Sequence, residues 1–271
     1  MLHLLGLEWK KIRYYRTFQV LVVLFIIALP GIMMIPKTFS SLPDEIISKD
    51  MFYMFPNGWK FFGYVGNWLA FFFLGFLAVI SATTEYANKT LRQNIITGLS
   101  RRQFFSAKLS FIIAISLAAT LYYTFVCLLF GFTHTETIYM SKVFQEADLI
   151  PRFFLMCLGY TSFGLLVGLL IRRTGIALFL YLSYVMIIEL ILRYPIHMRF
   201  FTNRSIHFYP MNAIEDLVPI DIPPFNQLAD EFMDENNFSF FLTPTEAVIT
   251  SSFYIGLFLL GSYLLLEKRD L

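Results

Sequence analysis

The sequence predicts an all-α integral membrane protein with six transmembrane helices, and two observations carry this prediction. First, 57% of the 271 residues are hydrophobic and 15% are charged, whereas a soluble domain usually has about a quarter charged residues. Second, six apolar runs are each long enough to cross about 30 Å of hydrocarbon at ~1.5 Å per residue. We therefore expect a single transmembrane domain over residues 1–271, multi-pass in the cell membrane and surrounded by the lipid bilayer.

The predicted elements follow in chain order. Residues 1–17 come first, and their apolar positions Leu2 and Leu5 recur at helical spacing with basic side chains largely elsewhere. Such a helix lies in the membrane interface with its cations toward the head groups, although an ordinary juxtamembrane start is the alternative. Its candidate interface residues are Trp9, Lys10, Lys11 and Arg13. The predicted transmembrane helices are 18–35, 61–83, 108–132, 153–171, 175–192 and 247–266.

The charge distribution predicts which side of the membrane each loop occupies. An even number of spans places both termini on one side, together with the loop at 84–107. Together with Lys108, which opens the third span, and the short turn that contains Arg172 and Arg173, these segments carry 13 of the 21 basic residues and 4 of the 19 acidic ones. The positive-inside rule therefore places both termini and this loop in the cytoplasm. The longest outer segment, 193–246, contains several prolines and an amphipathic stretch, so we expect short extracytoplasmic helices there.

Catalytic and metal-binding motifs are missing from the sequence. None of the 14 glycines is followed by lysine, so a phosphate-binding P-loop cannot be built. HExxH, GxSxG and CxxC are also absent. Cys127 and Cys157 lie in apolar runs without neighbours at metal-ligand spacing, and we interpret them as small apolar fillers. We therefore expect no catalysis, no cofactor and no metal in this chain.

Two features inside the apolar runs are candidates for special roles. Glu189 is the ionisable residue well inside a span, and Arg193 follows at the spacing of a helical ion pair. A functional carboxylate is one interpretation, and an ion pair near the outer interface is the favoured one. Gly164 and Gly168 have the GxxxG spacing that permits close helix contact. We expect packing within one chain, with dimerisation as the alternative.

The loop at 84–107 resembles a coupling element. It reads as a short amphipathic helix, a turn at Gly98 and a new helix from Arg101. Its order of residues is similar to the permease subunit of type-2 (ABC-2) ABC transporters, with a Glu leaving span two and a Lys opening span three. The matching positions are Glu85, Thr90, Leu91, Arg92, Arg101 and Lys108. Two positions depart from the family pattern: Lys89 replaces a usual Gly, and Leu99 stands near a common Pro.

The resemblance covers the whole chain and implies a fold and a set of partners. Residues 1–17 would be the elbow helix of this family, 84–107 the cytoplasmic coupling region, and 193–246 would hold the short extracytoplasmic helices. Two permease chains, identical or paralogous, would pair to form an exporter. Each would dock on a separate ABC ATPase subunit, which would use ATP and Mg²⁺.

The sequence also bears on three other classes of membrane protein. A stand-alone channel or secondary carrier should show polar residues in several spans or an internal repeat, and neither is present. A membrane enzyme lacks its catalytic constellation, and no nucleic-acid partner is expected. A non-transporting scaffold of an envelope complex stays an alternative. The transported substrate is left open.

Overall fold

The computed structural model describes residues 2–38, 49–88, 98–201, 203–220 and 239–268, together with the single positions 90, 93, 96, 227, 230, 231 and 233. Within these residues the regular structure is helical, without strands, and six helices are long and apolar enough to cross a membrane. The predicted fold class, an all-α membrane protein with six spans, is confirmed at this level.

The six spans are long, and two of them, the second and the fifth, include π-helical segments. In chain order the spans are α2 (Arg16–Thr38); α3 (Asn57–Leu69), η2 (Ala70–Leu74) and α4 (Gly75–Ala87); α6 (Arg101–His134); α8 (Leu149–Ile171); α9 (Thr174–Ser183), η3 (Tyr184–Ile188), α10 (Glu189–Ile191), η4 (Leu192–His197) and α11 (Met198–Phe200); and α14 (Pro244–Lys268). The shorter elements are α1 (Leu2–Ile12), η1 (Lys49–Phe52), α7 (Met140–Val143), η5 (Arg204–Phe208) and α12 (Pro210–Glu215).

The fifth span continues beyond residue 192, the end that the sequence predicted. Pro195 suggested a loop there, yet it lies inside the π-helical segment η4. Proline has no backbone N–H and its ring crowds the preceding turn of an α-helix. A π turn rearranges the hydrogen-bond ladder locally, so the chain stays helical through Phe200.

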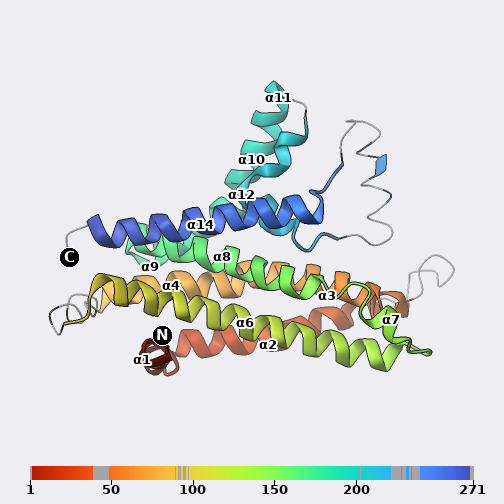
Figure 1. Ribbon diagram of the computed structural model, residues 1–271, viewed down its shortest axis with the longest axis horizontal. Helices are drawn as coiled ribbons and strands as arrows, with labels where there is room; N and C mark the ends of the chain where they lie inside the picture. The colour runs from red at the N-terminus through yellow and green to blue at the C-terminus, as the bar shows by residue number, and fades with distance from the viewer. Residues whose placement is uncertain are drawn as a thin grey trace.

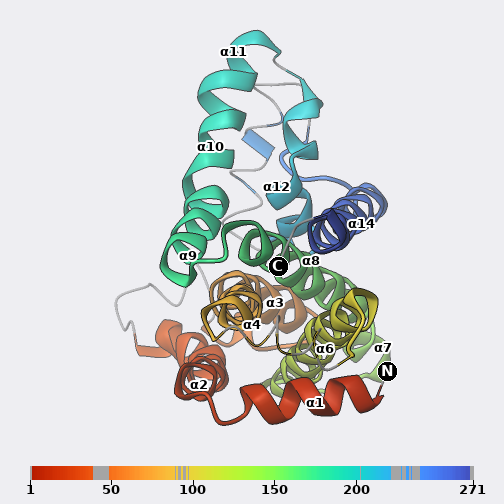
Figure 2. The same cartoon turned by 90° about the vertical axis from the view of Figure 1, so that its left-hand side faces the viewer.

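The first four spans and the sixth form a bundle, while the fifth span begins against it with α9 and then leaves it (Figure 1). In Figure 1 the helices α2, α3–α4, α6, α8 and α14 run side by side, while α10 and α11 project away from them. In the end view of Figure 2, α1 starts beside α2 and runs below α6, against which it packs. The start of α6, the end of α14 and α1 lie at the same end of the bundle, which we call the α1 end.

The core is centred on α8, which packs closely against α4. A Cβ atom built on Gly164 would lie 2.6 Å from the carbonyl oxygen of Gly75, and one on Gly168 would lie 2.8 Å from the Cβ of Ala82. Both distances are shorter than real contacts, so glycine is what allows the two backbones to approach. The predicted use of the GxxxG spacing, packing within one chain, is confirmed.

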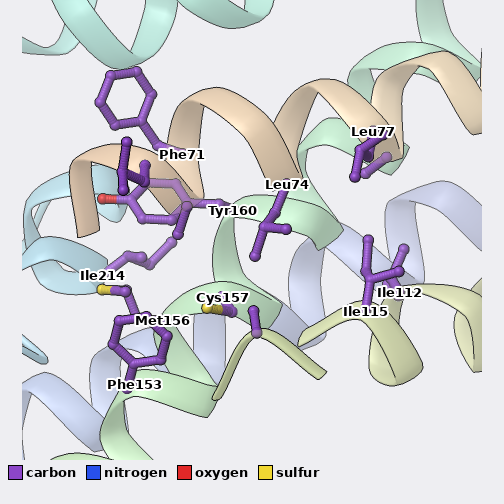
Figure 3. Close-up of a cluster of buried hydrophobic side chains, with 14 of the residues drawn as sticks. Phe71, Leu74, Leu77, Ile112, Ile115, Phe153, Met156, Cys157, Tyr160 and Ile214 are labelled. Atoms are coloured by element: carbon purple, nitrogen blue, oxygen red, sulfur yellow. The ribbon is translucent and has the colours of Figure 1, made fainter. Parts of the chain in front are cut away.

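Aromatic and aliphatic side chains fill the space around these helices. Figure 3 shows Leu74 and Leu77 facing the neighbouring helices, with Cys157 and Tyr160 on α8. Cys157 and Cys127 are both free and fully buried. They occupy core positions as small apolar side chains, as the sequence predicted.

Candidate functional site

Four charged side chains from three separate helices form a closed ring at the α1 end. α1 contributes Glu8 and Lys11, α4 contributes Glu85, and α6 contributes Lys108. Lys108 Nζ lies 2.6 Å from Glu8 Oε2 and 3.0 Å from Glu85 Oε1. Lys11 Nζ lies 3.1 Å from Glu8 Oε1 and 3.1 Å from Glu85 Oε1. Positive and negative groups therefore alternate around the ring, and its formal charges cancel.

This charge ring is buried. Lys108 is 1% exposed, Glu8 2% and Glu85 3%, and only the Lys11 side chain, 36% exposed, reaches the surface. Ions taken out of water are costly unless they are paired and their remaining hydrogen-bonding groups are satisfied. Here the Lys108 ammonium also donates to the carbonyl oxygen of Ser81 at 2.8 Å, and the Thr90 hydroxyl donates to Glu85 Oε2. The pairing lets these charges lie between the helices.

Lys11 shows the electrostatic effect of the ring outside the spans. Burial alone would lower the pKa of its ammonium, because burial disfavours the charged form. The adjacent carboxylates of Glu8 and Glu85 outweigh burial, so the pKa of Lys11 is raised. Lys11 is therefore charged at neutral pH.

α1 is also held by an aromatic contact. Trp9 packs edge-on against Phe18 at 5.9 Å between ring centroids, and Phe18 in turn contacts Phe111 of α6. Lys10 and Arg13 are exposed, and the Arg13 guanidinium lies over the Tyr14 ring. Of the predicted interface residues, Lys11 alone joins the ring.

The turn before the third span has the geometry that its sequence predicts. Gly98 has a φ of 103°, which side-chain-bearing residues rarely adopt. Ser100 then caps α6: its hydroxyl accepts from the amide of Gln103, and the Gln103 side chain accepts from the amide of Ser100. This reciprocal capping box fixes the start of α6 at Arg101.

Arg101 and Arg102 join the start of α6 to the end of α14. Arg101 donates to the carbonyl oxygens of Leu266, at 3.1 Å, and Glu267. Arg102 Nε donates to the Tyr263 hydroxyl at 3.1 Å. The carbonyl groups in the last turn of a helix have no partners within it, so Arg101 acts as a side-chain cap for α14.

The predicted coupling residues thus fall into separate groups. Glu85, Thr90 and Lys108 come together in and around the charge ring, whereas Arg101, at the start of α6, contacts the end of α14 instead. Leu91 and Arg92 lie outside the described residues, and so does Lys89, which differs from the family pattern. The sequence interpretation missed Glu8 as a partner of this group. Its spacing of three residues from Lys11 was the available signal, since such pairs meet on one helix face.

The expected ion pair between Glu189 and Arg193 is not the contact that Glu189 makes. Its two carboxylate oxygens accept from the backbone amides of Met211, at 2.9 Å, and Asn212, at 2.7 Å. These amides belong to the first turn of α12, where N–H groups have no partner in the helix and attract an anion. Glu189 therefore caps α12 from the fifth span.

Arg193 instead points toward the segment before α12. Its Nε donates to the carbonyl oxygen of Ile206 at 3.2 Å, and its guanidinium lies 3.5 Å from Nδ1 of His207. Burial, with Arg193 and Arg204 nearby, lowers the pKa of His207 to about 4. Although Arg193 follows Glu189 by one helical turn, both side chains bond to residues between 206 and 212, after the end of the fifth span.

Asp216 anchors the other end of α12. Its Oδ2 accepts from the amide of Leu242 at 2.9 Å and from Asn212 Nδ2 at 3.0 Å. Burial, which disfavours the charged carboxylate, raises the pKa of Asp216 to about 8. Glu189 and Asp216 together fix α12 between the fifth span and the start of the sixth.

The charge ring joins three helices through buried ion pairs. Within the described part of the chain, no group of three or more His, Cys, Asp or Glu side chains is placed to hold a metal ion. The ring connects α1 to the end of the second span and the beginning of the third. The buried pairs hold these three elements against one another.

Comparison with known protein families matches residues 4–197, most of the chain, to the family described as ABC-2 family transporter protein. The match includes α1, the charge ring and the first four spans, and it ends within the fifth span. A search of curated proteins finds no match.

Proposed function

Because the chain belongs to the ABC-2 family of transporter proteins and is a multi-pass membrane permease subunit, we propose that it works in an ATP-driven exporter. In this proposal two permease chains form the translocation pathway. A separate ABC ATPase subunit hydrolyses ATP with Mg²⁺, and this chain binds no nucleotide itself. The charge ring is the observation that carries the mechanical part of the proposal.

The charge ring brackets the segment proposed to meet the ATPase. Glu85 lies before residues 89–97 and Lys108 lies after them, and the two side chains are in direct contact. A force applied to this segment therefore reaches the ends of the second and third spans at the same place. Glu8 and Lys11 extend the connection to α1, so the elbow would move with both spans.

The end of the sixth span would receive the same force. Arg101 follows the proposed ATPase-facing segment and holds the last carbonyl groups of α14. The α1 end would then respond to the ATPase as one unit. We place this end in the cytoplasm, where the ATPase would bind, because its segments carry most of the basic residues.

The fifth span supports the pairing of two permease chains. α10 and α11 project away from the bundle (Figure 2), and little of this span is covered by the rest of the chain. Exposed apolar side chains such as Ile187 and Leu190 line it. A second chain, the same or a paralogue, would cover part of this surface while lipid covers the remainder.

Gentle purification of the tagged chain from native membranes tests the partner assignment. We expect a P-loop ATPase to co-purify in stoichiometric amount.

A pair of variants tests the coupling. Arg101→Ala should weaken the coupling of ATP hydrolysis to conformational change in the spans, whereas Arg199→Ala, which replaces an exposed arginine on α11, should not. A chain that purifies alone in every detergent would contradict the proposal and favour a stand-alone channel, a carrier or a scaffold.

A further inference from the structure

Two adjoining cavities of opposite polarity lie beside the charge ring. The first, about 210 Å³, has a polar side that includes both charged and neutral residues of the ring region: Lys11, Tyr15, Ser81, Thr84, Glu85, Asn88, Thr90 and Lys108. The second, about 190 Å³, is lined by apolar and aromatic residues of α1, α2, η2, α4 and α6. Phe18 and Leu77 line both cavities, so the polar cavity and the apolar one adjoin at these two side chains.

The free hydrogen-bond donors of the polar cavity come from Lys11, Tyr15 and Asn88, because the Ser81 and Thr84 hydroxyls donate to carbonyl groups of their own helix. The Glu85 carboxylate in the lining is occupied by Lys11, Lys108 and Thr90. The Lys11 ammonium has three hydrogens, and its bonds to Glu8 and Glu85 use two of them. Asn88 Nδ2 donates to the Tyr15 hydroxyl at 3.1 Å, which leaves the tyrosine hydrogen to donate elsewhere. Both Tyr15 and Asn88 are exposed. Lys11 is the cation that opens to the surface.

Charge around the cavity favours an anion. The ring itself is formally neutral, because its two ammonium groups balance its two carboxylates. Exposed Lys10 near the end of α1, Arg13 on the turn and Arg16 at the start of α2 add positive charge. A basic cluster at the end of membrane spans attracts anionic lipid head groups.

The apolar cavity has the form of a groove for a chain. Phe25 and Leu74 line its buried side, while Ile26 and Ala118 are exposed at its rim. It therefore opens toward the lipid between α2 and α6. Trp9 lines the cavity at the α1 end, where an aromatic side chain suits the boundary between hydrocarbon and head groups.

We propose that this pair of cavities binds one anionic glycerophospholipid. The phosphate would lie against Lys11, Tyr15 and Asn88, and one acyl chain would lie in the groove between α2 and α6. A soluble phosphate would use the polar cavity alone, so the adjoining apolar groove favours a lipid. The evidence for this site does not rest on the proposed coupling to an ATPase, although Lys11 belongs to both, and the bound lipid would brace α1 and α2 against α4.

Native mass spectrometry of the delipidated full-length protein, titrated with phosphatidylglycerol, tests the site. Tyr15→Phe with Asn88→Leu removes head-group donors without touching the charge ring, and Ala118→Phe fills the groove from its exposed rim. Matched controls are Tyr14→Phe, an exposed neighbour, and Leu121→Phe, an exposed position on the same helix that lines neither cavity. A second titration with glycerol 3-phosphate distinguishes a lipid from a soluble phosphate.

We expect one saturable phosphatidylglycerol per chain in the wild type and in both controls. The donor variant and the groove variant should each bind it about fivefold to tenfold more weakly, as the loss of one or two hydrogen bonds or of apolar contact implies. Equal binding by all variants would overturn the proposal. Displacement of the lipid by equimolar glycerol 3-phosphate would also overturn it and assign the site to a soluble phosphate.

Discussion

At the scale of single residues, Lys108 makes the central contacts of the charge ring at the α1 end. Its ammonium contacts both carboxylates of the ring and the carbonyl oxygen of Ser81. It is also nearly inaccessible to water. Removing one partner of a buried ion network leaves uncompensated charge, which costs more than the network's own net stabilisation.

Lys108→Met should therefore destabilise the protein strongly. The variant leaves two buried carboxylates with only Lys11 between them, and the free energy of unfolding should fall by about 3–5 kcal/mol. Thermal unfolding in detergent, followed by tryptophan fluorescence, measures the change. Lys142→Met, at an exposed position of α7, is the control.

A double variant separates charge balance from the loss of side-chain volume. Glu8→Gln with Lys108→Met removes one charge of each sign and leaves the pair of Glu85 and Lys11. It should be more stable than Lys108→Met alone, because the remaining charges balance. If Lys108→Met were as stable as the Lys142→Met control, the ring would have no structural role.

The sequence singled out Glu85 and Lys108, but it did not predict that they touch. Each lies at the end of a span, where a charge is common and has many possible partners. Their contact depends on how α4 and α6 pack, and Glu8 comes from a third helix about a hundred positions before Lys108. Glu189 shows the same limit, since its partners on α12 follow from the path of the chain after the fifth span.

At the scale of elements, the contact between α4 and α8 depends on missing side chains. Gly164 faces the backbone of Gly75, and Gly168 faces Val79 and Ala82. Within a bilayer, small residues let helices gain packing and backbone contacts that larger side chains would prevent. The GxxxG spacing predicted this closeness, while the identity of the partner helix needed the structure.

Gly164→Val should push these two helices apart. Its Cβ would meet a backbone oxygen, which cannot move aside as a flexible side chain can. Overpacking of this kind costs about 1–3 kcal/mol, measurable as a lower thermal unfolding midpoint. Gly256→Ala is the control, because a Cβ there meets nothing within 4 Å. If Gly164→Val were as stable as Gly256→Ala, the close contact between α4 and α8 at Gly164 would be contradicted.

At the scale of the whole molecule, the spans could be predicted better than their ends. Hydrophobic length located all six, because backbone groups in hydrocarbon must bond internally and a helix is the local way to do so. The path after residue 192 could not be predicted. A π-helical segment there keeps the chain helical past Pro195, and tertiary contacts such as that of Arg193 with Ile206 hold residues 193–200 in place.

The orientation of the molecule is the last prediction, and it rests on charge alone. Basic residues gather at the α1 end, so we expect that end to face the cytoplasm. Single cysteines replacing Lys10 and Arg173 should react with a membrane-impermeant maleimide only after the cells are opened. One replacing Tyr139, exposed before α7, should react in intact cells.

The native cysteines do not interfere with this labelling, since Cys127 and Cys157 are buried. If Lys10→Cys reacted in intact cells while Tyr139→Cys did not, the orientation in the membrane would be the opposite of the predicted one. The charge ring would then lie on the side of the membrane without ATP, and the proposed connection between the ring and an ATPase would fail. Because the ring, the caps of α6 and α14, and the basic residues all lie at one end, the orientation decides whether this end can receive work from ATP.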